Sequence, residues 1–185
     1  MKRFVFVSCF ILIVASLALS GGQKEAGKEV AKKATIEFVS QLPEYEARYQ
    51  AVWEVFMKEN LEIDVDDIID SIPILAVIGC YNRGKLMLKN GLNARKKESD
   101  RIFAITNELK KMKAKIIEKK DGLGVEGSKL EAATLNSHRD HRIAMALTIA
   151  ALGIEKPSLI EDVDCINKTY PTFKKDFKSL GCAIL

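Results

Sequence analysis

The chain has 185 residues, of which 48% are hydrophobic, and this is enough to bury one substantial core or two small ones. Its 29 basic and 25 acidic residues leave a net charge of +4, with the basic residues dispersed along the chain. These values exclude a disordered or low-complexity chain and give no indication of nucleic-acid binding.

The cysteines and histidines do not predict a metal centre. Cys9, Cys80, Cys165 and Cys182 are far apart, and no CxxC pair is present. The two histidines are close together in the sequence, and no pair of cysteines with the spacing of metal ligands accompanies them. Neither a zinc site nor a disulfide framework is expected, and buried thiols are the simpler interpretation.

The first 22 residues have the pattern of an export signal. Lys2 and Arg3 precede an uncharged run over residues 4–19, and Ala18 and Ser20 are small residues placed for cleavage before Gly21. The run is shorter than the roughly 20 apolar residues that a relaxed membrane span needs. A cleaved signal over residues 1–22 is therefore expected rather than a permanent anchor.

A tether and a short strand and helix follow the signal. Residues 23–34 are rich in Gly, Lys, Glu and Ala, which is typical of a solvated tether. Residues 35–40 alternate like a strand, and Pro43 opens a helix that has Tyr45, Tyr49, Val52 and Phe56 on one face. Residues 1–61 resemble the start of extracellular solute-binding proteins of ABC transporters, which implies an exported binding module.

Residues 62–185 are organised as two copies of one unit. The pattern predicts helices over 70–81, 99–112, 140–153 and 173–181, strands over 85–90, 114–119, 157–163 and 182–185, a turn at 82–84, and a loop that carries Lys168. Asp70 then aligns with Asp140, and Lys97 aligns roughly with Lys168. Two helix–strand–helix–strand units predict an α/β fold in which helices cover a sheet.

Basic residues gather near the predicted helix starts. Lys97, Arg101, Arg142 and Lys168 each lie at or near such a start, where free backbone N–H groups favour an anion. Guanidinium groups add paired donors for phosphate or carboxylate. The alternative is that Glu98, Asp100 and Asp140 simply cap and charge-match helix starts, with His141 a structural histidine.

Four motifs carry a family resemblance when taken in order. DSIP, NARKKESDRI, DHRIAMA and NKTYPTF, all within residues 62–183, resemble the C-terminal part of the 5-enolpyruvylshikimate 3-phosphate synthase (3-phosphoshikimate 1-carboxyvinyltransferase) family. The resemblance implies a partial enolpyruvyl transferase fold with about two repeats of one domain, preceded by the signal-like helix and the strand–helix piece.

The resemblance also implies an activity and its residues. The family transfers enolpyruvyl from phosphoenolpyruvate to the 5-hydroxyl of shikimate 3-phosphate in aromatic amino acid biosynthesis, through a tetrahedral intermediate and without a metal or other cofactor. The implied catalytic residues are Asp70 as base toward the hydroxyl, Glu98 as acid or base, and His141 as an assisting group. The implied substrate-binding residues are Asn93 and Lys97 for shikimate 3-phosphate and Arg101, Arg142 and Lys168 for phosphoenolpyruvate.

The resemblance leaves three functional hypotheses open. The first is an enolpyruvyl transferase that lacks the family's other domain, turns over weakly or not at all by itself, and needs a complementary domain or associates with itself through uncovered apolar edges. The second is an exported solute-binding module, and the third is an inert fusion remnant joined near Asn60–Asp66. The enzyme family predicts a cytoplasmic location, whereas residues 1–22 predict export.

Overall fold

The computed structural model describes residues 60–184. The signal expected at 1–22, the tether at 23–34 and the strand and helix expected between 35 and 59 lie outside these residues. Among the helices of residues 60–184, none has the length and apolar character that crossing a membrane requires.

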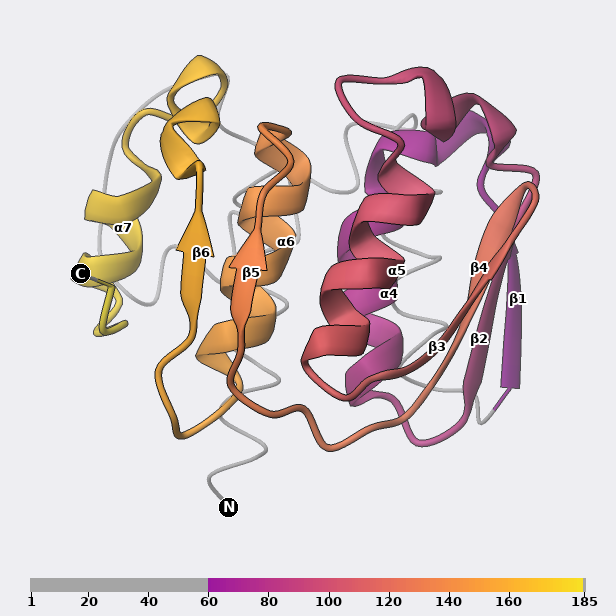
Figure 1. Cartoon of the computed structure of the whole chain (residues 1–185), viewed down its shortest axis with the longest axis horizontal. Helices are drawn as coiled ribbons and strands as arrows, with labels where there is room; N and C mark the ends of the chain where they lie inside the picture. The colour runs from indigo at the N-terminus through magenta and orange to yellow at the C-terminus, as the bar shows by residue number, and fades with distance from the viewer. Residues whose placement is uncertain (1–59, 185) are drawn as a thin grey trace, which may run out of the picture. The chain divides into compact units, whose positions relative to one another are not determined.

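The first repeat unit is a four-stranded mixed sheet covered by two helices (Figure 1). In chain order its elements are β1 (Asn60–Asp64), the 3-10 helix η1 (Asp66–Ser71), α4 (Ile72–Tyr81), β2 (Lys85–Lys89), the 3-10 helix η2 (Leu92–Lys96), α5 (Arg101–Lys111), β3 (Lys115–Lys119) and β4 (Gly122–Glu126). β1 and β2 are parallel and are connected through α4. β4 lies between β2 and β3 and is antiparallel to both.

The core of this unit lies between the sheet and its helices. Alternate residues of the strands point inward, so Leu61, Ile63, Leu86 and Leu88 are buried while their neighbours in the sequence face outward. α4 is buried over eight of its ten residues, because the sheet packs on one of its sides and α5 and α6 pack on others. A continuous apolar layer therefore lies between the sheet and the helices of the first unit.

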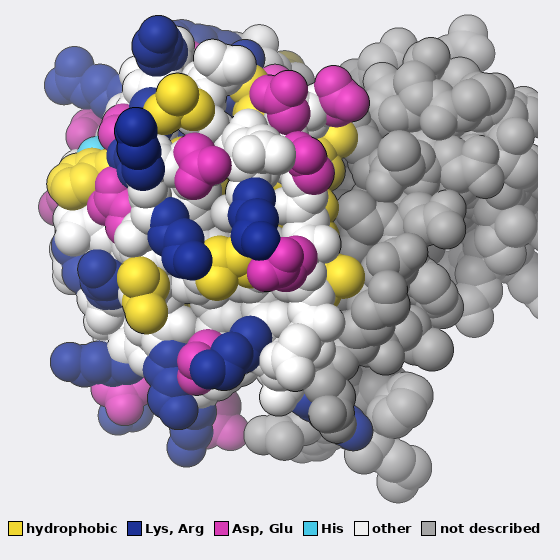
Figure 2. All heavy atoms as spheres, turned by 90° about the vertical axis from the view of Figure 1, so that its right-hand side faces the viewer, with side chains coloured by type: hydrophobic (Ala, Val, Ile, Leu, Met, Phe, Trp, Pro, Cys, Tyr) yellow, Lys and Arg dark blue, Asp and Glu magenta, His cyan; other side chains and the backbone are white. Residues whose placement is uncertain are grey.

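The outer face of the four-stranded sheet is charged with both signs. Figure 2 shows basic and acidic side chains interspersed with a few hydrophobic ones on this side of the molecule. Cross-strand ion pairs join Lys85 to Glu126 at 2.7 Å and Lys89 to Glu62 at 2.5 Å. Exposed pairs of this kind contribute roughly 0–1 kcal/mol to stability.

The second unit repeats the strand–helix–strand order on a smaller scale. Its elements are β5 (Thr134–Asn136), α6 (His141–Leu152), β6 (Leu159–Glu161), the 3-10 helix η3 (Val163–Lys168) and α7 (Phe173–Ser179). β5 and β6 are parallel and are connected through α6, as β1 and β2 are through α4. α6 packs against α4, α5 and η3. The predicted α/β fold class, with helices covering a sheet, is confirmed.

Several elements differ from the sequence prediction. The strands β1, β4 and β5 were not predicted, and the domain boundary expected after residue 61 falls inside β1. Residues 182–184 of the expected last strand form none, and Lys168 ends a 3-10 helix rather than lying in an open loop.

The sequence did not predict β4 because this strand contains glycine. A Cβ added at Gly122 would lie 1.9 Å from the Leu88 carbonyl oxygen, so the close approach of these two strands requires glycine. Glycine lowers the strand signal of a sequence although the backbone here is paired on both sides.

Candidate functional site

The amino ends of α4, α5 and α6 lie at the same end of the two units, at the top of Figure 1. Each helix follows a strand whose carboxyl end points the same way: β1 leads to α4, β2 to α5 and β5 to α6. Ligands of α/β proteins commonly bind at the carboxyl ends of such strands. The predicted site residues are concentrated at this end.

Arg101, the first residue of α5, is the centre of the site. Its side chain is 1% exposed. Its Nη1 donates to Asp70 Oδ1 at 2.6 Å, its Nε donates to Asp140 Oδ2 at 2.7 Å, and its Nη2 donates to Glu98. One buried guanidinium therefore ties together carboxylates from the start of α4, the loop before α5 and the start of α6.

Asp70 is surrounded by cations on more than one side. Besides Arg101, Arg142 Nη2 lies 3.2 Å from Asp70 Oδ2 and Lys97 Nζ lies 3.4 Å from Asp70 Oδ1. Partial burial raises the pKa of Asp70, but Arg142, Arg101 and Lys97 together lower it by more, so the pKa is below its usual range. Three of the four predicted cations thus converge, and a carboxylate of the protein occupies the place between them.

Asp140 combines capping with ion pairing. Its carboxylate is fully buried and accepts from the Arg142 amide at 2.9 Å, which caps α6, and from Ser99 Oγ at 3.0 Å. Burial raises the pKa of Asp140, but the hydrogen bonds and charge of Arg101, with the Arg142 amide and Ser99, outweigh this and lower it. The expected N-cap is therefore confirmed, and the same carboxylate also anchors Arg101.

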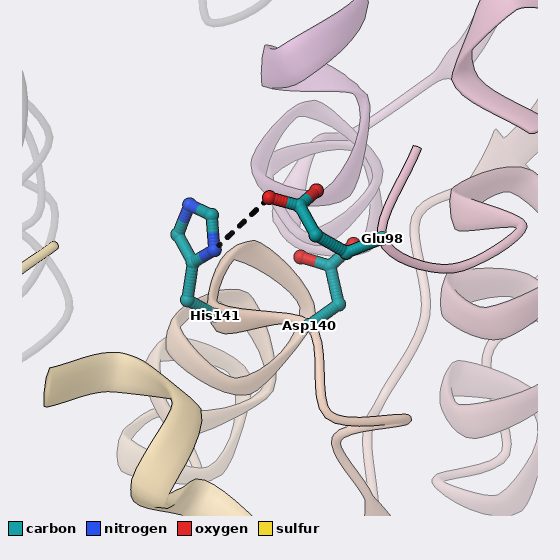
Figure 3. Close-up of side chains that lie close together, drawn as sticks. All are labelled: Glu98, Asp140 and His141. Atoms are coloured by element: carbon teal, nitrogen blue, oxygen red, sulfur yellow. Dashed lines mark ion pairs between the residues drawn. The ribbon is translucent and has the colours of Figure 1, made fainter. Parts of the chain in front are cut away.

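Glu98 and His141 face each other beside this centre (Figure 3), with His141 Nδ1 3.7 Å from Glu98 Oε1. Burial and the neighbouring Arg142 lower the pKa of His141 by more than Asp140 and Glu98 raise it, so the imidazole is neutral at pH 7. The ligand atoms of Glu98, Asp140 and His141 lie within 4.8 Å of one another, a spacing that could hold a metal ion. Arg101 already donates to both carboxylates, so a metal would have to displace it.

The basic residues of the stretch 93–101 have different tasks. Arg95 lies away from Asp70 and is held by Asp100 and Glu118, each at 2.8 Å, and by the carbonyls of Lys119 and Lys120. It clamps the loop before α5 onto the β3–β4 hairpin. Asp100 also caps α5 by accepting from the Phe103 amide at 3.0 Å. The capping interpretation is therefore correct for Asp100, while Lys97 and Arg101 belong to the cation cluster.

Asn93 and Lys168 are less closely connected to the centre. Both are exposed, and within residues 60–184 neither side chain has an ion pair or hydrogen bond. Lys168 lies on η3, which packs against α6. Sequence reasoning treated Asp140 only as a cap and did not single out Ser99. The alignment of Asp140 with Asp70 between the repeats was the signal that could have identified Asp140 as a residue of the site.

The charges of the central cluster balance. Lys97, Arg101 and Arg142 stand against Asp70, Glu98 and Asp140, and His141 is neutral. The side chains of Lys97, Arg142, Asp70 and Glu98 are between 35% and 47% exposed, whereas Arg101 and Asp140 are buried. The arrangement thus has a rigid buried pair and an accessible ring of cations and carboxylates that could exchange partners with an anionic ligand.

The repeated strand–helix–strand units bring arginine, lysine and carboxylate side chains together at one shared end. This arrangement defines an α/β protein whose site is suited to an anionic ligand. A sequence model of the family EPSP synthase (3-phosphoshikimate 1-carboxyvinyltransferase) matches residues 15–177. The chain belongs to this family.

Individual relatives agree with this assignment. The chain is 50% identical over 118 residues to 3-phosphoshikimate 1-carboxyvinyltransferase of Chlamydia abortus, covering 64% of this chain and 26% of the relative. It is 45% identical over 127 residues to the protein of the same name from Methanocaldococcus jannaschii, covering 68% and 30%. The solved structure of EPSP synthase from Acinetobacter baumannii matches with a TM-score of 0.61 and 28% identity, over 65% of this chain and 30% of that one. The chain thus spans about 26% to 30% of the length of these relatives.

Proposed function

We propose that residues 60–184 form part of the substrate site of a 3-phosphoshikimate 1-carboxyvinyltransferase and bind phosphoenolpyruvate next to shikimate 3-phosphate. The observation that carries the proposal is the convergence of Lys97, Arg101 and Arg142 on Asp70. Guanidinium and ammonium groups held this way are suited to a ligand with both carboxylate and phosphate groups.

The reaction consists of an addition and an elimination. The 5-hydroxyl of shikimate 3-phosphate forms a C–O bond to the substituted carbon of phosphoenolpyruvate while the methylene carbon gains a proton. The tetrahedral intermediate then loses phosphate as the resulting methyl group gives up a proton, which restores the double bond. Donors and acceptors of protons are therefore needed on both sides of the reacting carbons.

The side chains have the chemistry for these roles. Asp70 stays ionised and is partly exposed, so it can accept a hydrogen bond and a proton from the hydroxyl. Glu98 and neutral His141 lie together as a candidate pair for moving the second proton. Arg142 and Lys168 would bind the charged groups of phosphoenolpyruvate, and Asn93 and Lys97 would hold shikimate 3-phosphate. Arg101 would join the phosphoenolpyruvate site by exchanging one of its carboxylate partners for the ligand, because its side chain is buried and paired with Asp70, Glu98 and Asp140.

Turnover is expected to need groups from outside these residues. The chain corresponds to about 26% to 30% of its relatives, and catalysis depends on closing both substrates between all of their binding groups. Large hydrophobic side chains are exposed in both units, among them Ile117 in the first and Leu159 and Leu180 in the second, which supports the proposal that a complementary domain or self-association covers them.

The nature of residues 1–61 stays a proposal. The family predicts a cytoplasmic enzyme, whereas the export signal and the resemblance to solute-binding proteins predict an exported module or a fusion. The family match begins at residue 15 and runs across the junction expected near Asn60–Asp66, which favours the enzyme interpretation.

Binding of phosphoenolpyruvate to the full chain, measured by calorimetry, tests the proposal. We expect saturable binding that weakens by about tenfold or more in Arg142→Ala, because one of the charge-assisted contacts is lost. Lys96→Ala is the matched control, since Lys96 is an exposed cation at the end of η2 and its loss changes the charge equally. A folded chain that does not bind phosphoenolpyruvate would overturn the proposal.

A further inference from the structure

α5 carries a second buried charged residue besides Arg101, which is Glu108, two helical turns further along the helix. Glu108 has a side chain that is 1% exposed, although carboxylates are rarely buried unless they are paired. Burial raises the pKa of Glu108, but hydrogen bonds from Lys111, the Asn136 amide and His138, with the charge of Lys111, lower it by more. Glu108 is thus an ionised group in the interior that the proposed reaction does not use.

The partners of Glu108 belong to the turn that leads into the site. Its Oε2 accepts from the Asn136 amide at 2.9 Å, and its Oε1 lies 3.0 Å from His138 Nε2. Asn136 ends β5, and four residues later Asp140 caps α6. Glu108 therefore fixes the end of β5 and the following turn to a helix of the first unit.

The turn has a backbone conformation that needs such support. His138 and Arg139 have φ angles of +53° and +56°, in the left-handed region that residues with a side chain rarely adopt. Conformations of this kind persist only where the surrounding structure holds them, and they are concentrated at functional sites. Immediately after these two residues come Asp140, His141 and Arg142.

Other contacts hold the opposite side of the turn. Ser137 is fully buried, donates to the Asp162 carbonyl at 2.8 Å and accepts from the Arg139 amide at 3.0 Å. These contacts come from the second unit itself. α5 holds this segment at two places: Glu108 contacts Asn136 and His138 of the turn, and Arg101 contacts Asp140 directly after it.

We propose that Glu108 is a positioning residue that holds the His138–Arg139 turn in its left-handed conformation and thereby sets where His141 and Arg142 lie relative to Arg101. The inference rests on the proposed function, because it assigns Glu108 to the same anion site. Glu108 acts only through the turn and does not contact the substrates.

The first test uses the two histidines of the chain as reporters. In ¹⁵N spectra of the imidazole rings, we expect the proton of His138 on Nε2, because an ionised Glu108 can only accept. Glu108→Gln should change the His138 signals and also shift those of His141. Lys111→Ala, which removes the half-exposed partner of Glu108 and leaves its contacts to the turn, should leave His141 unchanged. Unchanged His141 signals in Glu108→Gln would overturn the proposal.

The second test measures phosphoenolpyruvate affinity and includes a rescue. Glu108→Gln should weaken binding about tenfold, because the turn can leave its strained conformation. Adding Arg139→Gly should recover most of that loss, since glycine adopts a positive φ without strain and Arg139 is exposed without a side-chain partner in residues 60–184. Loss of affinity without recovery would mean that Glu108 only stabilises the fold and would contradict the positioning role.

The two proposals fail in distinguishable ways. If the wild-type chain does not bind phosphoenolpyruvate, the proposed function fails, while the imidazole spectra still decide whether Glu108 positions His141. If the wild type binds and the variant binds equally well, Glu108 is not a positioning residue and the substrate site stands.

Discussion

The two repeat units place equivalent acids in different surroundings. Asp70 of the first unit lies in a 3-10 turn, is 35% exposed and makes no cap, whereas Asp140 of the second unit is fully buried and caps α6. Both nevertheless accept from Arg101, one on each side of the same guanidinium. The difference teaches that a repeated residue can become a structural anchor in one copy and an accessible site group in the other, according to its burial.

The largest loss of stability is expected from substitution of Arg101, because its side chain joins the equivalent acids of the two repeat units. Arg101→Met should lower the free energy of unfolding by about 3–5 kcal/mol, since Asp140 is left buried without its cation. Urea denaturation followed by circular dichroism measures this. Arg139→Ala is the control, because Arg139 is exposed. A loss below that of a typical surface substitution would show that the two acids do not depend on Arg101.

Substitution of the two acids should separate their roles in stability. Asp140→Asn should cost about 1–3 kcal/mol, because a buried charged partner of Arg101 is replaced by a neutral one. Asp70→Asn should have a smaller effect, as Asp70 is partly exposed and an amide oxygen can still accept from Arg101. Unfolding of both variants under identical conditions makes the comparison. Equal losses would contradict the division into anchor and site group.

Substitution of Asp70 and of Asp140 should also have different effects on the affinity for an anionic ligand. Asp70→Asn should tighten phosphoenolpyruvate binding about threefold to tenfold, because Asp70 competes with the ligand for Arg142 and Lys97 and removing its charge leaves the cluster positive. Asp140→Asn should not tighten it, since that carboxylate is buried behind Arg101. Calorimetric titration gives both affinities. Weaker binding in Asp70→Asn would mean that Asp70 helps to hold the ligand instead.

Acid should weaken the fold in two stages. The lowered pKa of His141 means that the unfolded chain takes up a proton first, so stability falls as the pH drops through about 6.5 toward the folded pKa. The lowered pKa values of Asp70 and Asp140 contribute stability above their unfolded value near 3.8 that is lost as the pH falls through the folded values. Urea midpoints between pH 8 and pH 2 test this, with His141→Gln expected to remove the first stage only.

The smallest effect on stability is expected from substitution of Lys168. Lys168→Ala should change the free energy of unfolding by less than about 0.5 kcal/mol, because its side chain has no partner within residues 60–184. It should still weaken phosphoenolpyruvate binding severalfold through loss of a cation. Lys174→Ala, an exposed lysine of α7, is the control. Equal affinity in the two variants would remove Lys168 from the site.

The sequence predicted the helices well and the sheets less well. The helices predicted to begin at Asp70 and Ser99 are α4 (Ile72–Tyr81) and α5 (Arg101–Lys111), and each begins two residues after its predicted start. β5 has three residues and β4 contains two glycines, so a local pattern could not reveal these strands, whose pairing partners decide them. The expected strand after residue 181 has apolar residues, but residues 182–184 pair with no strand.

By itself, the sequence determined the α/β class, the repeat, the four motifs and the helix starts, because these depend on local periodicity, capping residues and spacing. Only the tertiary structure decided how the charges pair. It assigned Arg95 to a structural clamp, placed Asp70 among three cations, buried Asp140 behind Arg101, and joined Glu108 to the turn before α6. The physical reason is that the strength of a charge depends on its burial and on partners that are distant in the chain, which no local pattern specifies.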